Sequence, residues 1–384
     1  MKIMHLSDLH IGLKLINYSM IKDQQYILKQ ITEIAEKQNP DAIVIAGDIY
    51  DRAVPSAEAV KLFDDFISGL SVAVPETEIM IISGNHDSAC RIDVFRNILS
   101  KNKIHMIGIP PVYPDEYIER VTLRDDFGNV NFFLLPFIKP STVRLITGTD
   151  ENGNNLSYDK AVHKIIEREN IDTTERNVLV SHQFYLKCGI SPKNVERMDS
   201  ETVTVGNIDH VYSDVLERFD YSALGHIHKP SDAGSEFYRY CGTPLACSVS
   251  EAGQQKGVIM VNLAEKGNVE ISVIPLKPLH EIRILKGTFS ELMEQSSEDY
   301  VTAVVTEESG IVKKNIKNEL KSRFPNLLEV RINNPSRPDY SVKYSEDREK
   351  DIFELCKSFL DGADETEQEI LRDIINKVKE EEEI

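Results

Sequence analysis

The sequence predicts an α/β fold, and two observations lead to that class. Over the first 275 residues, short apolar segments of strand length alternate with longer segments in which apolar residues recur at helical spacing. The chain has 384 residues, 41% of them hydrophobic, which allows two or three domains with a substantial core. This composition is typical of a folded globular protein and excludes disordered and collagen-like chains.

The elements expected in this first part follow from local patterns. Ser56 has the character of a helix N-cap, with Pro55 before it and Val60, Phe63 and Ile67 at helical spacing after it. Residues 147–155 (TGTDENGNN) are expected to form a polar loop. Strands are expected at 2–6, 42–46, 78–83, 131–135, 178–181, 221–224, 257–262 and 269–274, and helices at 23–36, 56–69, 91–100 and 159–167.

A change in pattern at Pro275 and Pro278 indicates a domain boundary. Beyond it, strands at 279–286, 300–306 and 328–332 with a helix at 310–323 predict a small α+β domain. Two amphipathic helices are expected at 351–360 and 367–379, after a linker containing Pro335 and Pro338. The predicted organisation is therefore a large domain at 1–275, a small one at 276–333, a linker at 334–345 and C-terminal helices at 346–384.

The net charge of −19 is spread unevenly along the chain. Residues 346–384 carry 15 acidic and 6 basic side chains (net −9), residues 276–345 carry 11 basic and 10 acidic (net +1), and 1–275 carry the remaining −11. Acidity of this kind argues against a nucleic-acid partner, since proteins that bind nucleic-acid phosphates usually carry a surface patch rich in Lys and Arg. The distribution weakens that objection, because about half of the excess negative charge lies in the segment of the two expected C-terminal helices.

The cysteine content and hydropathy of the chain indicate a cytoplasmic protein. Five cysteines without CxxC spacing are expected to stay reduced and to form no disulfide framework. No apolar segment reaches 18 residues, so no membrane span is expected. The first residues show no basic start followed by an apolar stretch, so no signal peptide is expected either.

Polar motifs follow five of the expected strands. They are Asp8-Leu9-His10, Gly47-Asp48 with Asp51, Gly84-Asn85-His86-Asp87, Ser181-His182 and Gly225-His226-Ile227-His228. Open α/β sheets place active sites at the carboxyl ends of their strands. A mixed set of carboxylate, imidazole and amide ligands with one bridging carboxylate is what a two-metal hydrolytic centre needs.

Each motif alone is weak evidence, since a single Asp-x-His after a strand is more often a turn than a metal site. Five such motifs in series are far more specific, because the same coincidence would have to recur after five strands. The other histidines lack ligand-type neighbours at useful spacing and are interpreted as structural or surface residues: His5, His105, His163, His210 and His280.

The order DxH, GDxxDR, GNHD, SH and GHxH resembles the calcineurin-like metallophosphoesterase superfamily. Within it, four segments are similar to the SbcD family of bacterial nuclease subunits. They are SDLHIG, GDIYDRAVPS, GNHDS and CGTPLACSVSE, the last at residues 241–251. This resemblance is specific through residue 251 and only compositional after about residue 276. It implies a β-sandwich flanked by helices for 1–275, a capping domain for 276–333 and a C-terminal helical pair that docks on an ATPase.

The resemblance also assigns roles to residues. One metal ion is expected at Asp8, His10, Asp48 and His228, and a second at Asp48, Asn85, His182 and His226, with Asp48 bridging. His86 is the expected catalytic histidine, and Asp51 occupies the position that orients it. The two ions, with Mn²⁺ preferred, would activate water for phosphodiester hydrolysis, and His86 would assist the leaving oxygen.

The function implied by the resemblance is a metal-dependent DNA nuclease: a 3′–5′ double-strand exonuclease and a single-strand or hairpin endonuclease. Its expected partners are DNA ends and hairpins and the coiled-coil ATPase SbcC, with a homodimer inside a heterotetramer that acts in DNA replication, recombination and repair. The dimer is expected through helices near 56–69 and 91–100.

Three alternatives stay open at this point. The chain could be a small-molecule phosphodiesterase, a protein phosphatase, or a non-catalytic scaffold that bridges DNA to an ATPase. Protein phosphatases usually carry GNHE, whereas this chain has Asp87, and intact ligand positions argue against a scaffold. A basic set on the helix expected at 310–323 is interpreted either as a DNA-backbone contact or as a solvated face: Lys313, Lys314, Lys317, Lys321 and Arg323.

Overall fold

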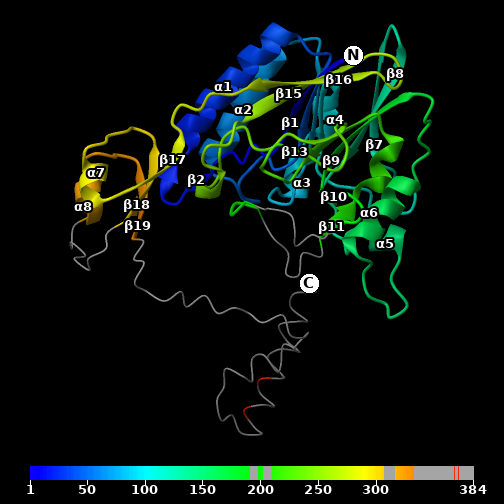
Figure 1. The fold of residues 1–384 in the computed structure, drawn as a ribbon. Coiled ribbons are helices and arrows are strands. Elements are labelled where there is room, and N and C mark those ends of the chain that lie inside the picture. Colours follow the sequence, from blue (N-terminus) through cyan, green and yellow to red (C-terminus); the bar gives the residue numbers. More distant parts are fainter. Residues whose placement is uncertain (191–197, 202–208, 307–315, 333–366, 368–370, 372–384) are drawn as a thin grey trace. The chain divides into compact units, whose positions relative to one another are not determined.

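A computed structural model gives the fold, and it describes residues 1–190, 198–201, 209–306, 316–332, 367 and 371 (Figure 1). The chain divides into two compact units, Met1–Asn334 and Pro335–Ile384. The strands and helices named below all lie in the first unit. The predicted domain boundary at residue 275 falls inside this unit and stays a prediction. The predicted linker and C-terminal helical pair lie almost wholly outside the described residues.

The first unit is built around two six-stranded mixed sheets, as the predicted β-sandwich requires. In the first sheet the strand order is β16-β15-β1-β4-β5-β6, and the run from β1 to β6 is parallel. Its strands are β1 (Lys2–Leu6), β4 (Ala42–Ala46), β5 (Glu78–Ile82), β6 (Ile104–Ile107), β15 (Gly257–Leu263) and β16 (Val269–Pro275).

The second sheet has the order β13-β14-β12-β9-β8-β7, and its four inner strands run parallel. Two small two-stranded sheets, β2-β3 and β10-β11, accompany the large ones. The strands of these sheets are β7 (Glu119–Asp125), β8 (Gly128–Leu135), β9 (Arg176–His182), β12 (Tyr221–Gly225), β13 (Ser231–Asp232), β14 (Tyr238–Tyr240), β2 (Lys14–Leu15), β3 (Tyr18–Ser19), β10 (Phe184–Leu186) and β11 (His210–Tyr212).

Three apolar clusters hold the sandwich together. The inner cluster combines residues of both sheets, for example Val44 and Met80 from the first with Phe132 and Val180 from the second. The outer face of the first sheet packs on α1 (Ile21–Gln38) and α2 (Ala57–Ala73), and that of the second packs on α6 (Tyr158–Glu167). Figure 1 shows these helices as coils beside the sheets. The strands buried on both faces are almost continuously apolar, which is why they are visible in the sequence.

The helix expected at 91–100 is wrong as a single element. The structure has two short helices, α3 (Ala89–Ile92) and α4 (Arg96–Leu99), separated at Phe95, whose φ of 64° is left-handed. Asp93 lies at this break and accepts a hydrogen bond from the Gly108 N–H at 3.1 Å. In contrast, the predicted cap at Ser56 is confirmed, because its side chain accepts the Ala59 N–H at 3.2 Å. Two further short helices are α5 (Arg144–Thr147) and η1 (Ser100–Asn102).

The predicted α+β elements after residue 276 form a separate parallel sheet of three strands, β17 (Ile282–Gly287), β18 (Tyr300–Val305) and β19 (Leu327–Ile332). They share an apolar cluster with α7 (Phe289–Met293) and α8 (Ile316–Lys321). Lys317 and Lys321 lie on α8, and Arg323 follows it, whereas Lys313 and Lys314 lie outside the described residues. No helix in the described part combines the length and apolar character needed to cross a bilayer.

Candidate metal centre

The seven predicted ligand residues come together at one edge of the sandwich. Asp8 and His10 follow β1, Asp48 follows β4, and Asn85 follows β5. His182 ends β9 in the second sheet, and His226 and His228 follow β12. Because the five strands run parallel within their sheets, their carboxyl ends present these side chains at the same end of the fold.

One group of side chains gathers around His10. Its Nε2 lies 3.0 Å from Nε2 of His228 and 3.7 Å from a carboxylate oxygen of Asp48. Ligand atoms of Asp8, His10 and His228 all lie within 4.8 Å of one another. Two imidazole nitrogens that face each other across 3.0 Å beside carboxylates are suited to hold a shared cation.

A second group gathers around His182. Its Nε2 lies 3.2 Å from the same Asp48 oxygen and 3.0 Å from Oδ1 of Asn85. Nδ1 of His226 lies 2.9 Å from that Asn85 oxygen. Asp48 is therefore common to both groups, the position that a bridging ligand needs.

Burial makes a cation at this centre physically reasonable. Asp8, Asp48 and His182 are each at most 1% exposed, and Oδ2 of Asp8 has no hydrogen-bond partner among the described residues. A buried carboxylate without a partner is costly unless a cation or a proton compensates its charge. The donor set of buried carboxylate, imidazole and amide atoms therefore fits a divalent metal ion.

Burial and neighbouring charges shift the pKa values of the two groups in different directions. Burial, together with the neighbouring His228, lowers the pKa of His10 well below its ordinary value, so the imidazole is neutral. Burial alone raises the pKa of Asp48, but His182 and His10 outweigh it and hold that pKa well below its ordinary value. Burial alone also lowers the pKa of His182, whereas Asp48 raises it to about 9. Asp48 thus attracts positive charge to this position, either a proton or a metal ion.

The backbone at these positions is strained. Asp8, His10, Asp48 and His226 have φ values of 52°, 43°, 48° and 96°, in the left-handed region that non-glycine residues rarely adopt. They make up half of the eight non-glycine residues with positive φ in the described ranges. Such strain costs free energy and persists where the surrounding structure enforces it, most often at functional sites.

Two glycines of the predicted motifs allow close approach of the ligands. A Cβ atom on Gly84 would lie 2.1 Å from Oδ1 of Asp48, and one on Gly225 would lie 1.9 Å from the Ala46 carbonyl oxygen. Neither contact is possible, so only glycine fits. The glycines in GNHD and GHxH therefore make room for Asp48 and for the backbone of β4.

His86 lies beside the two groups. Its ring packs edge-on against His10, with the centroids 4.9 Å apart, and its backbone N–H donates to Oδ1 of Asp48 at 2.9 Å. Nδ1 of His86 lies 3.0 Å from the backbone carbonyl oxygen of Asp51. His86 also borders a cavity of about 290 Å³ together with Asn85, Phe137, Lys139 and Tyr158. A histidine in this place can face a substrate next to the metal centre.

Asp51 contacts His86 through its main chain, and the orienting role of its side chain stays a prediction. The backbone carbonyl of Asp51 contacts His86, while its carboxylate lies 3.4 Å from Nε of Arg52. The backbone of the loop after β4 therefore orients the His86 ring.

Asp87 has a role that the sequence did not indicate beyond its place in GNHD. Its carboxylate is 9% exposed and accepts hydrogen bonds from the N–H groups of Ile49 and Tyr50 at 3.0 Å and of Gly84 at 2.9 Å. It thereby joins the loop after β4 to the loop after β5, which carry Asp48 and Asn85. The partners in the β4 loop lie 37 and 38 residues away along the chain, so no local pattern reveals them.

Asp87→Ala is expected to lower the free energy of unfolding by about 3–5 kcal/mol, because three buried N–H groups lose their acceptor at about 1–3 kcal/mol each. Urea unfolding followed by circular dichroism measures this change. Asp126→Ala, on an exposed turn, is the control and is expected to change stability by less than about 0.5 kcal/mol. An Asp87→Ala protein as stable as the control variant would contradict this role.

The remaining histidines contact other side chains outside the metal centre. Nδ1 of His5 lies 2.8 Å from the Tyr221 hydroxyl, His105 pairs with Glu78 at 2.7 Å, and His280 pairs with Asp23 at 2.9 Å. His163 contacts Asp214 at 3.2 Å, and His210 packs against the ring of Tyr212. None of these five belongs to a metal-type cluster within the described residues.

Comparison with known proteins agrees with this geometry. A family model described as calcineurin-like phosphoesterase matches residues 1–230. A curated relative, the SbcD subunit of the SbcCD nuclease of Staphylococcus epidermidis, is 30% identical over 336 residues, which cover 85% of this chain and 84% of that protein.

Similar solved structures are more distant. They include the protein TT1561 of Thermus thermophilus (11% identity, TM-score 0.40, covering 71% of this chain and 98% of that one). A dimetal phosphatase from Danio rerio is similar at 14% identity with a TM-score of 0.39, covering 72% of this chain and 99% of that one. Because these TM-scores are low, the assignment depends on the sequence matches. On those matches, the chain belongs to the calcineurin-like phosphoesterase family.

Proposed function

We propose that this chain is a metal-dependent DNA nuclease that acts with an SbcC-type ATPase in DNA-end processing, recombination and repair. The observation that carries the proposal is that two groups of predicted ligands share one buried carboxylate, Asp48, which lies 3.7 Å from His10 and 3.2 Å from His182, with His86 beside His10. The 30% identity to a curated nuclease subunit across most of both chains supports DNA as the substrate.

Two divalent ions, preferably Mn²⁺, would be held by these residues. The first set is Asp8, His10, Asp48 and His228, and the second is Asp48, Asn85, His182 and His226. When bound, such ions supply Lewis-acid stabilisation of phosphate oxygens and lower the pKa of a water molecule for attack on phosphorus. Nitrogen and oxygen ligands in this mixture suit Mn²⁺ but also other divalent ions.

The chain's own residues position and protonate the substrate. Because Nδ1 of His86 faces the Asp51 carbonyl oxygen, Nε2 is the ring nitrogen that we assign to protonate the leaving 3′ oxygen. Lys139, on the wall of the same cavity, adds positive charge for a neighbouring phosphate. Strained ligand loops and the Asp87 contacts hold the site before substrate arrives, so little reorganisation is needed.

A substrate panel tests this function directly. The purified full chain is incubated with hairpin DNA, blunt duplex DNA, a cyclic nucleotide and a phosphopeptide, each with Mn²⁺, with Mg²⁺ and with EDTA. We expect cleavage of both DNAs with Mn²⁺ and none with EDTA. Preferential turnover of the cyclic nucleotide or the phosphopeptide would replace the proposal by one of the other phosphoesterase functions.

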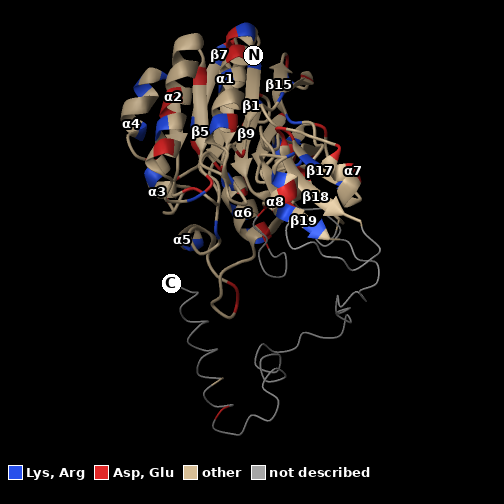
Figure 2. Ribbon diagram, turned by 90° about the vertical axis from the view of Figure 1, so that its left-hand side faces the viewer, with Lys and Arg blue, Asp and Glu red and all other residues tan. Residues whose placement is uncertain are grey.

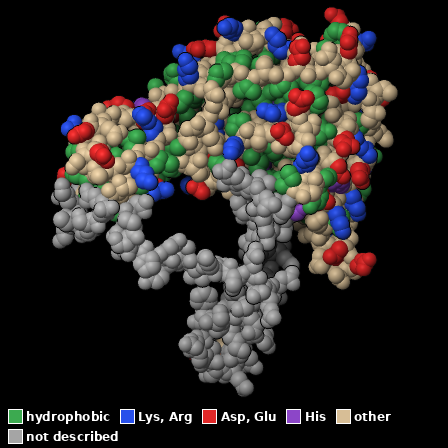
Figure 3. Space-filling model, in the orientation of Figure 1, with side chains coloured by type: hydrophobic (Ala, Val, Ile, Leu, Met, Phe, Trp, Pro, Cys, Tyr) green, Lys and Arg blue, Asp and Glu red, His purple; other side chains and the backbone are tan. Residues whose placement is uncertain are grey.

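The charge distribution supports a partner that contributes DNA affinity. Acidic and basic residues alternate along the ribbon of the first unit in Figure 2, and side chains of both signs are scattered over the face in Figure 3. With a net charge of −19, this chain alone is expected to bind DNA weakly. We propose that the acidic C-terminal segment at 346–384, with its predicted amphipathic helices, docks on the coiled-coil base of the ATPase, in a heterotetramer that contains two copies of this chain.

Deleting residues 346–384 is expected to abolish co-purification with the SbcC-type ATPase and to leave Mn²⁺-dependent cleavage by the isolated chain within about twofold. The reason is that the ligand residues all lie before residue 229, far along the chain from the deleted segment. Affinity co-purification and a hairpin cleavage assay measure the two effects. Retention of the complex by the truncated chain would exclude this segment as the docking site.

A further inference from the structure

We propose that Glu251 is a positioning residue that sets the tautomer and ring orientation of His228 through the hydroxyl of Ser200. In this arrangement His228 presents an unprotonated Nε2 to the metal centre. The inference rests on the proposed function to the extent that His228 is a metal ligand. In this proposal Glu251 acts only through Ser200 and His228.

The two ring nitrogens of His228 face different surroundings. Nε2 faces the metal centre, 3.0 Å from Nε2 of His10. Nδ1 lies on the other side of the ring, 2.7 Å from the Ser200 hydroxyl oxygen and 3.5 Å from Oε1 of Glu251. A neutral imidazole carries one proton, so the partner of Nδ1 decides whether Nε2 is free to bind a cation.

The hydroxyl of Ser200 determines where that proton resides. Ser200 Oγ lies 2.7 Å from Oε1 of Glu251, and a carboxylate can only accept a hydrogen bond. The single hydroxyl hydrogen of Ser200 is therefore directed to Glu251, which leaves its lone pairs for His228. Nδ1 must then be the protonated nitrogen, and Nε2 carries the lone pair that a metal ion needs.

Glu251 is fixed in this role by strong contacts to its other oxygen. It is 1% exposed, and its Oε2 accepts hydrogen bonds from the Lys256 ammonium at 2.7 Å and the Thr243 hydroxyl at 3.0 Å. Lys256 also donates to the backbone carbonyl of His228 at 2.9 Å. The backbone N–H of His228 donates to Glu201 at 2.9 Å, so both the main chain and the ring of His228 are held.

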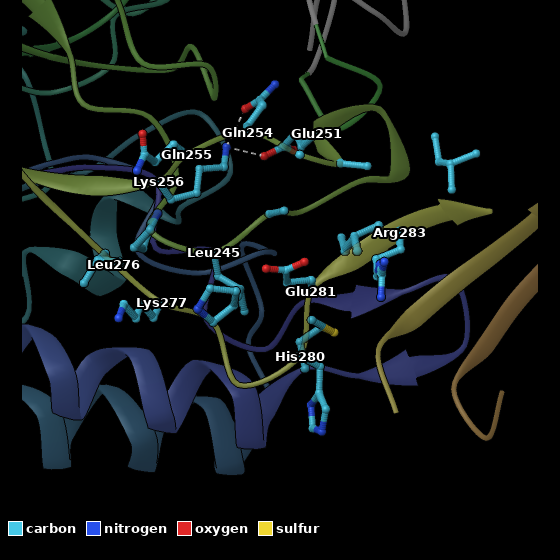
Figure 4. Close-up of a pocket in the computed structure, with 18 of the residues that line it drawn as sticks. Leu245, Glu251, Gln254, Gln255, Lys256, Leu276, Lys277, His280, Glu281 and Arg283 are labelled. Carbon is cyan, nitrogen blue, oxygen red and sulfur yellow. Dashed lines mark hydrogen bonds and ion pairs between the residues drawn. The ribbon is translucent and has the colours of Figure 1, made fainter. Parts of the chain in front are cut away.

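The contacts around Glu251 border a cavity of about 1010 Å³ next to β17 (Figure 4). Figure 4 shows Lys256 linked to Glu251 and Gln254, with Glu281 apart from this cluster. Glu281 lines the same cavity but has an exposed side chain and belongs to the segment leading into β17. It therefore offers a matched control, because its substitution removes the same charge from the same cavity.

The test compares Glu251→Gln with Glu281→Gln in the full-length chain. The introduced amide keeps its carbonyl oxygen toward Lys256 and Thr243, so its NH₂ group faces Ser200 and reverses that hydrogen bond. The Ser200 hydrogen then points to Nδ1 of His228, and the ring proton moves to Nε2. We expect calorimetric titration with Mn²⁺ to show a 10- to 100-fold weaker affinity at one of two sites. The affinity of the other site stays unchanged, as do both affinities in Glu281→Gln.

Ser200→Ala provides a second variant in case Glu251→Gln does not fold, since Ser200 is only partly buried. It removes the link between Nδ1 and Glu251 and is expected to weaken the same Mn²⁺ site about tenfold. Thermal unfolding without metal shows whether each variant is folded. A role confined to stability would lower the melting temperature and leave both Mn²⁺ affinities unchanged, and that result would overturn the inference.

The outcomes separate this inference from the proposed function. If the wild-type chain binds two Mn²⁺ ions and does not cleave DNA, while Glu251→Gln loses one site, the positioning role stands and the nuclease proposal fails. If wild-type and Glu251→Gln proteins bind Mn²⁺ equally well and both cleave DNA, the positioning role fails alone.

Discussion

Asp48→Asn is expected to remove metal binding and DNA cleavage together, the largest effect of any single substitution in this chain. One Asp48 oxygen lies 3.2 Å from Nε2 of His182 and 3.7 Å from Nε2 of His10, so the same carboxylate serves both groups of ligands. An amide of the same shape loses the negative charge that both ions share. We expect Mn²⁺ affinity to fall by more than about 100-fold and kcat by roughly 10⁴-fold.

The measurements are Mn²⁺ titration calorimetry, hairpin cleavage and the rise in melting temperature on adding Mn²⁺. Wild-type protein is expected to be stabilised by Mn²⁺ because the ion binds only the folded state, and Asp48→Asn is expected to lose this stabilisation. Asp64→Asn removes the same charge from an exposed position on α2 and is expected to behave as wild type. Two intact Mn²⁺ sites in Asp48→Asn would exclude Asp48 as the shared ligand.

The grouping of the seven predicted ligands follows from sequence because each of them lies at or just after the end of a largely apolar strand. β4 is buried at every residue, and Asp48 follows it after one glycine. The pattern is local, and parallel pairing of β1, β4 and β5 then brings the local signals to the same sheet edge. The parallel topology therefore brings five separate short motifs to one edge of the sandwich.

The residues that support the ligands could not be predicted in the same way. Asp87 accepts hydrogen bonds from backbone groups of a different loop, and backbone N–H groups carry no sequence signature. Glu251 acts through Ser200, which lies 51 residues earlier in the chain. Asp87 lies in the loop after β5 and Glu251 ends the short helix η5 (Val249–Glu251), and nothing in the sequence indicates which groups their carboxylates contact.

The break between α3 and α4 is another feature that the local sequence pattern did not predict. Residues 91–100 have helical spacing, but Asp93 accepts the Gly108 N–H, and Phe95 takes a left-handed conformation. A tertiary contact thus overrides a local preference. The strand β7 was also missed, because its burial alternates between partly buried and exposed residues and it lacks a long apolar run.

His86→Ala is expected to separate metal binding from catalysis, and this separation is what identifies a catalytic residue. The ring of His86 packs against His10 but belongs to neither of the two ligand groups around Asp48. Its contact with Asp48 is made by the backbone N–H, which the substitution keeps. We therefore expect two Mn²⁺ sites with affinities within about threefold of wild type, and kcat for DNA cleavage lower by roughly 10²–10⁴-fold.

Calorimetric titration and single-turnover cleavage of hairpin DNA measure the two quantities on the same preparation. Asn85→Ala, one position earlier, is the informative contrast, because Asn85 contacts both His182 and His226 and its loss is expected to weaken metal binding itself. His105→Ala controls for loss of a histidine outside the site, since His105 pairs with Glu78. Near-normal cleavage by His86→Ala would mean that the leaving oxygen needs no proton from this ring, and the metal centre alone would then account for the reaction.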